Sequence, residues 1–141
     1  MSATASAPPM VVLGFDWGSK SIGVAIGQSV TATANPLSIL KARQGVPDWS
    51  VIQKLMDQWE PDLIVVGIPL NMDGTESESS LQARRFGRRL EGRFAIRWEG
   101  VDERLSTVEA RNDLRDAGKS ADRVDSHAAA LIVESWFDQQ N

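Results

Sequence analysis

Hydrophobic residues in the first third of the chain occur in short runs separated by polar turns. These apolar runs cover residues 10–15, 22–27 and 31–40. Runs of this length, rich in β-branched residues, are typical of strands, and the short turns between them predict an antiparallel meander. Small residues alternate with larger apolar ones in 22–27, so one face of that strand favours close approach of another element.

The period changes after Pro47. Asp48 is a suitable N-cap, and apolar residues then recur at helical spacing as far as Trp59. Residues 63–66 are apolar without alternation, which predicts a strand buried on both faces. The other predicted elements are a loop at 67–80, a helix at 81–90, a strand at 94–99, a helix opened by a capping box at 106–109, and a last helix that begins at Asp125 or Ser126.

This order of elements predicts an α/β fold. Three antiparallel strands come first and two parallel strands follow, which gives a mixed five-stranded sheet flanked by helices. A chain of 141 residues fits one domain. We therefore predict a single domain over residues 10–141, preceded by a disordered Ser/Ala/Pro-rich tail at residues 1–9.

Composition narrows the function classes. The chain has no cysteine, which excludes a disulfide framework and any thiolate metal site. It shows neither a signal-peptide pattern nor an apolar run of about 18 residues, so we expect a cytoplasmic protein with no membrane partner. The net charge of −4 argues against non-specific binding of nucleic acid. A local cluster of arginines can nevertheless bind phosphate; it consists of Arg84, Arg85, Arg88, Arg89 and Arg93.

Three carboxylates stand at the ends of predicted elements. Asp16 ends the first strand, Glu103 follows the last strand beside Asp102, and Asp125 opens the last helix. Taken singly, each has a plain structural explanation as a turn residue, a solvated acid or a helix cap. Together they point to one sheet edge, where ligands bind in open α/β sheets. Converging carboxylates require a cation, and oxygen ligands favour Mg²⁺ or Mn²⁺, two of which can promote phosphodiester hydrolysis.

Four blocks of sequence carry a resemblance to a known family. They are FDWGSKSIGVA at 15–25, VGIPLNMDGT at 66–75, DERLSTVEA at 102–110 and VDSHAAA at 124–130. In their order and spacing the chain resembles the YqgF family, also called RuvX, from about Val11 to Phe137. The resemblance implies a ribonuclease-H-like fold and a RuvC-like, metal-dependent nuclease. It further implies processing of the 5′ end of precursor 16S rRNA in ribosome biogenesis, with cleavage of Holliday-junction DNA as the alternative.

The resemblance also assigns the site. Asp16, Glu103 and Asp125 become both the catalytic residues and the metal ligands, with Asp16 bridging two Mg²⁺ or Mn²⁺ ions. Asp102 is a substitute for Glu103, and His127 is expected to be non-catalytic. Nearby polar side chains are candidate substrate contacts, although a surface turn, ion pair or loop explains each equally well; they are Ser19, Lys20, Asn71, Arg85, Arg89 and Arg104. Trp17 is the tryptophan placed to stack on a base.

Two other functions fit part of this pattern. The Asp-x-Gly turn after the first strand also opens the phosphate loop of actin-like and sugar-kinase-like ATPases, but those enzymes clamp nucleotide between two subdomains. A non-catalytic RNA- or transcription-associated binding module would keep the fold without needing clustered acids. The expected partner is nucleic acid, precursor rRNA or branched DNA. The choice between monomer and homodimer stays open, because only paired cuts in a junction require two-fold symmetry.

Overall fold

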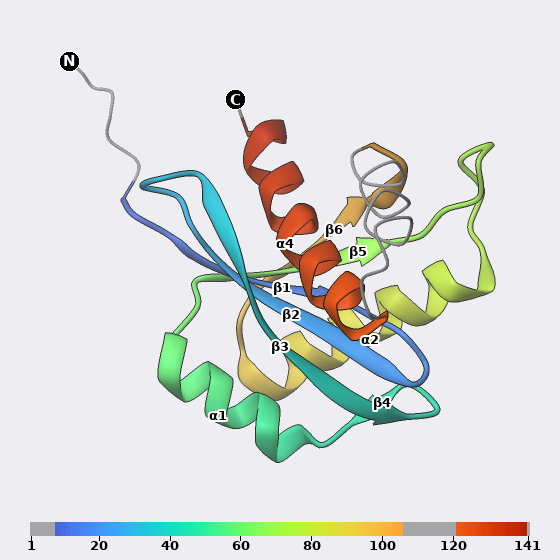
Figure 1. Cartoon of the computed structure of the whole chain (residues 1–141), viewed down its shortest axis with the longest axis horizontal. Coiled ribbons are helices and arrows are strands. Elements are labelled where there is room, and N and C mark those ends of the chain that lie inside the picture. Colours follow the sequence, from blue (N-terminus) through green and yellow to red (C-terminus); the bar gives the residue numbers. More distant parts are fainter. Residues whose placement is uncertain (1–7, 106–120, 141) are drawn as a thin grey trace.

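The computed structural model describes residues 8–105 and 121–140, which form a mixed sheet with helices on both faces (Figure 1). The predicted tail and the predicted helix after the capping box fall largely or wholly outside these residues. The elements run in the order β1 (Val11–Asp16), β2 (Ser21–Gln28), β3 (Thr33–Arg43), β4 (Val46–Pro47), α1 (Trp49–Trp59), β5 (Leu63–Ile68), α2 (Glu78–Phe94), β6 (Trp98–Asp102), a 3₁₀ turn η2 (Glu103–Leu105) and α4 (Ala121–Gln139).

The described strands form one sheet in the order β4-β3-β2-β1-β5-β6. Strands β1 to β4 pair antiparallel in succession, as the short turns between the early apolar runs predict. Strand β5 pairs parallel with β1 on one side and with β6 on the other. The mixed sheet is therefore confirmed. It has six strands rather than five, because β4 has only two residues and leaves no periodic signal in the sequence.

Several predicted boundaries are wrong. The helix expected at 81–90 is α2, Glu78–Phe94, and it begins inside the loop expected at 67–80. The strand expected at 94–99 is instead β6, Trp98–Asp102, because α2 continues to Phe94. Helix α2 ends where Ala95 adopts a left-handed conformation (φ 57°) and donates its N–H to the Glu91 carbonyl. The last helix begins at Ala121, so Asp125 lies inside it and is not its N-cap.

Two apolar clusters hold the layers together. On one face of the sheet, Phe15 and its neighbours pack against α1 and α2. On the other face, strand residues such as Val12 pack against α4. Every residue of β5 is buried, which confirms the prediction for residues 63–66. Asp48 caps α1 by accepting a hydrogen bond from the Ser50 N–H at 3.0 Å, also as predicted. Among the helices described here, none has the length and apolar character needed to cross a membrane.

Small residues let α4 lie directly on the sheet. A Cβ atom on Gly14 would stand 3.3 Å from the Ala129 carbonyl oxygen, and one on Gly27 would stand 3.1 Å from the Phe137 ring. Gly27 is paired with Val12, two residues before Gly14 in β1. Moving along β1 towards its carboxyl end therefore means moving along α4 towards its amino end (Figure 1). These close contacts between α4 and the sheet fix which part of α4 lies next to the carboxyl end of β1.

Candidate active site at the carboxyl edge of the sheet

The carboxyl ends of β1, β5 and β6 lie side by side. Phe15 of β1 pairs with Val66 of β5, and Ile68 of β5 pairs with Asp102 of β6. Asp16 is the last residue of β1, and Glu103 follows β6 directly. The sequence-based expectation that Asp16 and Glu103 both stand at strand ends is therefore confirmed, and both ends belong to the same sheet edge.

Asp16 lies on the face of the sheet that α4 covers. Side chains alternate between the faces along a strand, and Val12 and Gly14 of β1 both contact α4 residues. Asp16, two residues further on, shares that face and is paired with Gly23 of β2. The Asp16 side chain is half-buried and interacts with the surrounding protein.

Glu103 is the one charged residue among those described that is buried, with 6% of its surface exposed. Its side chain lies over Gly67 of β5: a Cβ atom on Gly67 would stand 3.0 Å from the Glu103 Cδ and 3.1 Å from its Cγ. The same Cβ would meet Ile132 of α4, so Glu103 is on the α4 face as well. Gly67 belongs to the strand between β6 and β1. The Glu103 carboxyl group therefore extends from β6 across β5, in the direction of Asp16.

Asp125 belongs to the first turns of α4. The structure places its backbone within the helix, and the position of its side chain lies outside the described part of the chain. Asp125 precedes Ala129 by one helical turn, and Ala129 contacts Gly14. Because α4 runs antiparallel to β1, the residue one helical turn before Ala129 lies near the next residue of β1 after Gly14 on the same face of the sheet. That residue of β1 is Asp16. His127, in the same turn, is exposed.

Asp102, the alternative to Glu103, is engaged elsewhere. The Arg104 side chain donates from Nη2 to Asp102 Oδ2 at 2.7 Å and from Nε to Oδ1 at 3.1 Å. The Arg104 backbone N–H also donates to Oδ1 at 2.9 Å. These hydrogen bonds hold the pKa of Asp102 below its ordinary value. Asp102 is paired with Ile68, which faces α2, so it points away from Asp16. Arg104, predicted as a substrate contact, thus forms an ion pair with Asp102.

The Asp102–Arg104 pair should make stability depend on acid pH. Because the pKa of Asp102 is lowered in the folded protein, the ionised carboxylate adds to the free energy of unfolding. This contribution is full at pH values above the unfolded pKa of 3.8 and is lost as pH falls through the folded pKa. Arg104→Gln removes the largest cause of the lowered pKa, the side-chain hydrogen bonds and charge of Arg104, and keeps the backbone hydrogen bond. Urea unfolding should therefore show wild type losing more stability than Arg104→Gln between about pH 5 and about pH 2. Parallel pH profiles for the two proteins would contradict this assignment.

Arg104 and Asn71 both fasten the loop between β5 and α2. Arg104 Nη1 donates to the Met72 carbonyl at 3.2 Å. The Asn71 side-chain amide donates to Thr75 Oγ1 at 3.0 Å, and Thr75 donates to Asp73. The predicted substrate contact Asn71 is therefore committed to the shape of its own loop. The loop stands at the carboxyl end of β5 with Met72 largely exposed at 86%.

The turn after Asp16 is fixed by its backbone. The carbonyls of Ser19 and Lys20 accept hydrogen bonds from the N–H groups of Gly45 and Ala42, both at 2.9 Å. The side chains of Ser19 and Lys20 are exposed, next to Asp16 in the chain. Trp17 donates its indole N–H to the Gly45 carbonyl at 3.0 Å. Arg85 and Arg89 lie beyond Trp17, on the α2 side of the sheet edge.

The donor set suits a hard divalent cation. Asp16 and Glu103 offer only carboxylate oxygens, and Glu103 is buried where a charge requires compensation by hydrogen bonds or a cation. Within the part of the chain that the structure describes, which leaves out the Asp125 side chain, no three acidic or histidine side chains form a metal-binding group. A third ligand would thus come from outside the described side chains, and the helix carrying Asp125 reaches this edge.

Sequence reasoning missed Gly67 and the residues around Trp17. Gly67 lies inside the block at 66–75, but its role depends on a side chain 36 residues later that no local pattern connects to it. Gln44 and Gly45 owe their importance to a two-residue strand, β4, that the sequence did not reveal. Their positive φ angles, 52° and 81°, are those of a tight turn, but the turn can be recognised only once β3 and β4 are known to form a hairpin.

Residues 10–139 match the family model of RuvX, described as a Holliday junction resolvase. The chain is 54% identical over 134 residues to a protein of Pectobacterium carotovorum subsp. carotovorum named "Putative pre-16S rRNA nuclease", with 92% of this chain and 96% of the relative covered. A Proteus mirabilis protein of the same name is 56% identical over 133 residues, with coverage of 92% and 96%.

Solved structures of resolvases share the fold. Thermus thermophilus RuvC in complex with a Holliday junction substrate superposes with a TM-score of 0.58 and 14% identity, over 94% of this chain and 97% of that one. The fowlpox virus Holliday junction resolvase gives a TM-score of 0.56 and 13% identity, over 94% and 100%. At these identities the likeness concerns the fold, and it confirms the ribonuclease-H-like class.

Proposed function

The chain belongs to the RuvX family of nucleases, and we propose that it hydrolyses phosphodiester bonds at a divalent-metal site held by Asp16, Glu103 and Asp125. The observation that carries the proposal is the buried Glu103 side chain, which lies across Gly67 in the direction of Asp16. Glu103, like Asp16, interacts with the surrounding protein, and carboxylate oxygens gathered at one sheet edge are the ligands that a hard divalent cation prefers.

Each part of the chain has a distinct task in this proposal. Asp16, at the end of β1, and Glu103, directly after β6, would hold the cation from one edge of the sheet, and Asp125 would supply a carboxylate from α4. When bound, Mg²⁺ or Mn²⁺ would supply Lewis-acid stabilisation of phosphate oxygens and activation of water. Arg104 keeps Asp102 turned away, so the acid beside Glu103 does not compete for the cation. Gly67 lets the Glu103 side chain lie directly on β5.

The substrate we propose is the 5′ end of precursor 16S rRNA, which would place the protein in the cytoplasm. The support comes from relatives 54% and 56% identical along almost their whole length, named for that RNA. Junction DNA is the second candidate, supported by the description of the family model. A junction resolvase needs two-fold symmetric copies to make paired cuts, whereas a monomer suffices to trim RNA.

One cleavage assay tests the activity and the substrate together. Precursor 16S rRNA and a four-way DNA junction are incubated in parallel with the full chain in Mg²⁺, in Mn²⁺ or in EDTA. We expect cleavage of the rRNA precursor with either metal and none in EDTA, because the acidic ligands act only through a cation. Paired cuts in the junction without cleavage of RNA would favour the second substrate. No metal-dependent cleavage of either substrate would refute the proposal.

A further inference from the structure

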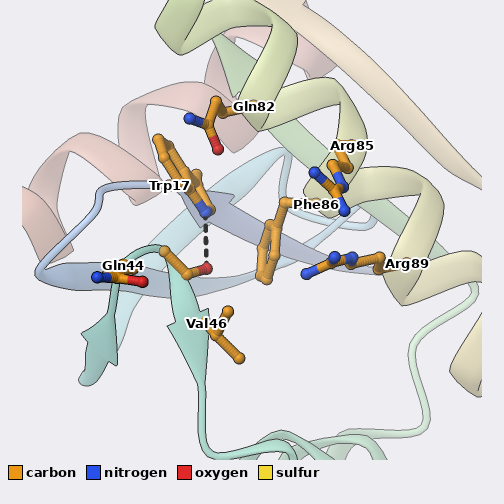
Figure 2. A pocket seen from close by; sticks show the side chains of 8 residues that line it. Trp17, Gln44, Val46, Gln82, Arg85, Phe86 and Arg89 are labelled. Carbon is orange, nitrogen blue, oxygen red and sulfur yellow. Dashed lines mark hydrogen bonds between the residues drawn. The ribbon is translucent and has the colours of Figure 1, made fainter.

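A hollow of about 200 Å³ lies between α2 and the β3–β4 hairpin, close to the end of β1. Figure 2 shows Arg85, Phe86 and Arg89 projecting from α2 on one side, Gln44 and Val46 on the other, and Trp17 beside them. Phe86 forms an aromatic floor, since its ring contacts Phe15 edge-on at 5.5 Å between centroids. The hollow thus has a rigid apolar base and two arginines at its rim.

The basic rim continues along α2. A second hollow of about 470 Å³ is lined by Trp49, Arg89, Gly92 and Arg93, so Arg89 belongs to both hollows. Arg85, Arg89 and Arg93 are spaced four residues apart, which puts them on one stripe of the helix. Arg93 lies over the Trp49 ring at 4.2 Å. We call the two hollows with this stripe the α2 groove.

The arginines of α2 differ in whether an acid already neutralises them. Arg84 makes two hydrogen bonds to the Glu76 carboxylate, at 2.8 and 3.0 Å. For Arg85 and Arg89, by contrast, no carboxylate among the described residues lies within ion-pairing distance. Both side chains are exposed. Two uncompensated guanidinium groups at the rim of a hollow are suited to a bidentate oxyanion such as phosphate.

The α2 groove is joined to the acidic edge through consecutive residues. Asp16 faces α4, and Trp17, the next residue, packs on the opposite side of the sheet against the α1–α2 core. Gly45 fixes Trp17 by its carbonyl, and a Cβ atom on Gly45 would collide with the indole ring. A strand of nucleic acid bound at Asp16 would therefore reach the α2 groove by passing around the end of β1.

We propose that the α2 groove binds the sugar-phosphate backbone of a single-stranded segment next to the scissile bond, with Arg85 and Arg89 holding its phosphates. This inference rests on the proposed nuclease function and adds the path of the substrate. A hollow of about 200 Å³ is comparable in size to the phosphate and sugar of one nucleotide. Backbone contacts of this kind position a strand without reading its sequence.

Binding in EDTA tests the α2 groove separately from cleavage. Anisotropy of a short fluorescein-labelled single-stranded RNA is titrated with wild type, with the double variant Arg85→Gln/Arg89→Gln, and with Arg88→Gln. Arg88 is exposed on the same helix but does not line either hollow, so its variant controls for the loss of one positive charge from α2 outside the groove. We expect the double variant to bind at least about tenfold more weakly. Its slope of log K against log salt should fall by about 1.4, the loss of two phosphate contacts to a single strand.

The outcomes separate the groove from the catalytic proposal. Equal binding by Arg88→Gln and the double variant, or no binding of RNA by wild type, would overturn the groove. Loss of binding in the double variant, with partial recovery in Arg85→Lys/Arg89→Lys, supports phosphate contacts through charge. If the double variant binds weakly while wild type cuts neither substrate, the nuclease proposal fails and the groove stands. If wild type cuts a substrate and the double variant binds RNA as wild type does, the groove proposal fails and the nuclease proposal stands.

Discussion

Replacing Asp16 with asparagine should abolish metal-dependent cleavage while leaving the fold intact. The amide is nearly isosteric but carries no charge, and the loss of a proposed metal-binding carboxylate would remove several kcal/mol of stabilisation of the transition state. A loss of about 4 kcal/mol corresponds to roughly a thousandfold lower rate. The side chain is half-buried at the sheet edge, outside the apolar clusters, so stability should change little.

Asp57→Asn is the matched control for this substitution. Asp57 is an exposed acid of α1, on the face of the sheet away from α4, and its replacement makes the same change of charge. Initial rates of precursor cleavage are compared at saturating Mg²⁺, with circular dichroism and thermal unfolding to verify the fold. Cleavage by Asp16→Asn at a rate within a few-fold of Asp57→Asn would remove Asp16 from the catalytic residues.

The neighbouring acids Glu103 and Asp102 should respond oppositely to the same substitution. Glu103→Gln should lower the cleavage rate by at least roughly a hundredfold, because it takes charge from the side chain that reaches towards Asp16. Asp102→Asn should retain the rate within a few-fold, because Asp102 faces Arg104 on the other side of the sheet. Each variant is thus the control for the other, with identical chemistry one residue apart.

The same pair can be separated further by metal dependence. Glu103→Gln should require a higher Mg²⁺ concentration for half-maximal rate, whereas Asp102→Asn should keep the wild-type value. The expected cost of Asp102→Asn is instead a looser β5–α2 loop, since Arg104 also donates to the Met72 carbonyl. A larger rate loss in Asp102→Asn than in Glu103→Gln would make Asp102 the metal ligand in place of Glu103, and would contradict the assignment of Asp102 to the ion pair with Arg104.

Much of the fold could be predicted from hydrophobic pattern. The unbroken apolar run at 63–66 correctly indicated a strand covered on both faces, and Asp48 correctly indicated the start of α1. Strand β6 was misplaced because Phe94, Ile96 and Trp98 alternate in burial. That alternation comes from the end of α2 and its connection packing on the core, which a local pattern cannot distinguish from a strand.

The candidate site was predictable in part. Asp16 needed only a strand followed by a polar turn, and the structure puts it there. The family resemblance favoured Glu103 over Asp102, but the hydrophobic pattern alone could not separate them, because the distinction depends on where β6 ends and on which face each side chain then takes. The members of the arginine cluster can likewise be told apart only in the structure. Arg84 forms an ion pair with Glu76, whereas Arg85 and Arg89 line the α2 groove.

The central claim is that carboxylates at this sheet edge bind the divalent metal that cleavage requires. Anomalous scattering from crystals soaked in Mn²⁺ tests it most directly, because the peak locates the ion independently of any substrate. We predict a Mn²⁺ peak between the carboxylates of Asp16 and Glu103 in wild type, and its loss in crystals of Asp16→Asn. A peak at Asp102, or Mn²⁺ bound unchanged in Asp16→Asn, would contradict this account.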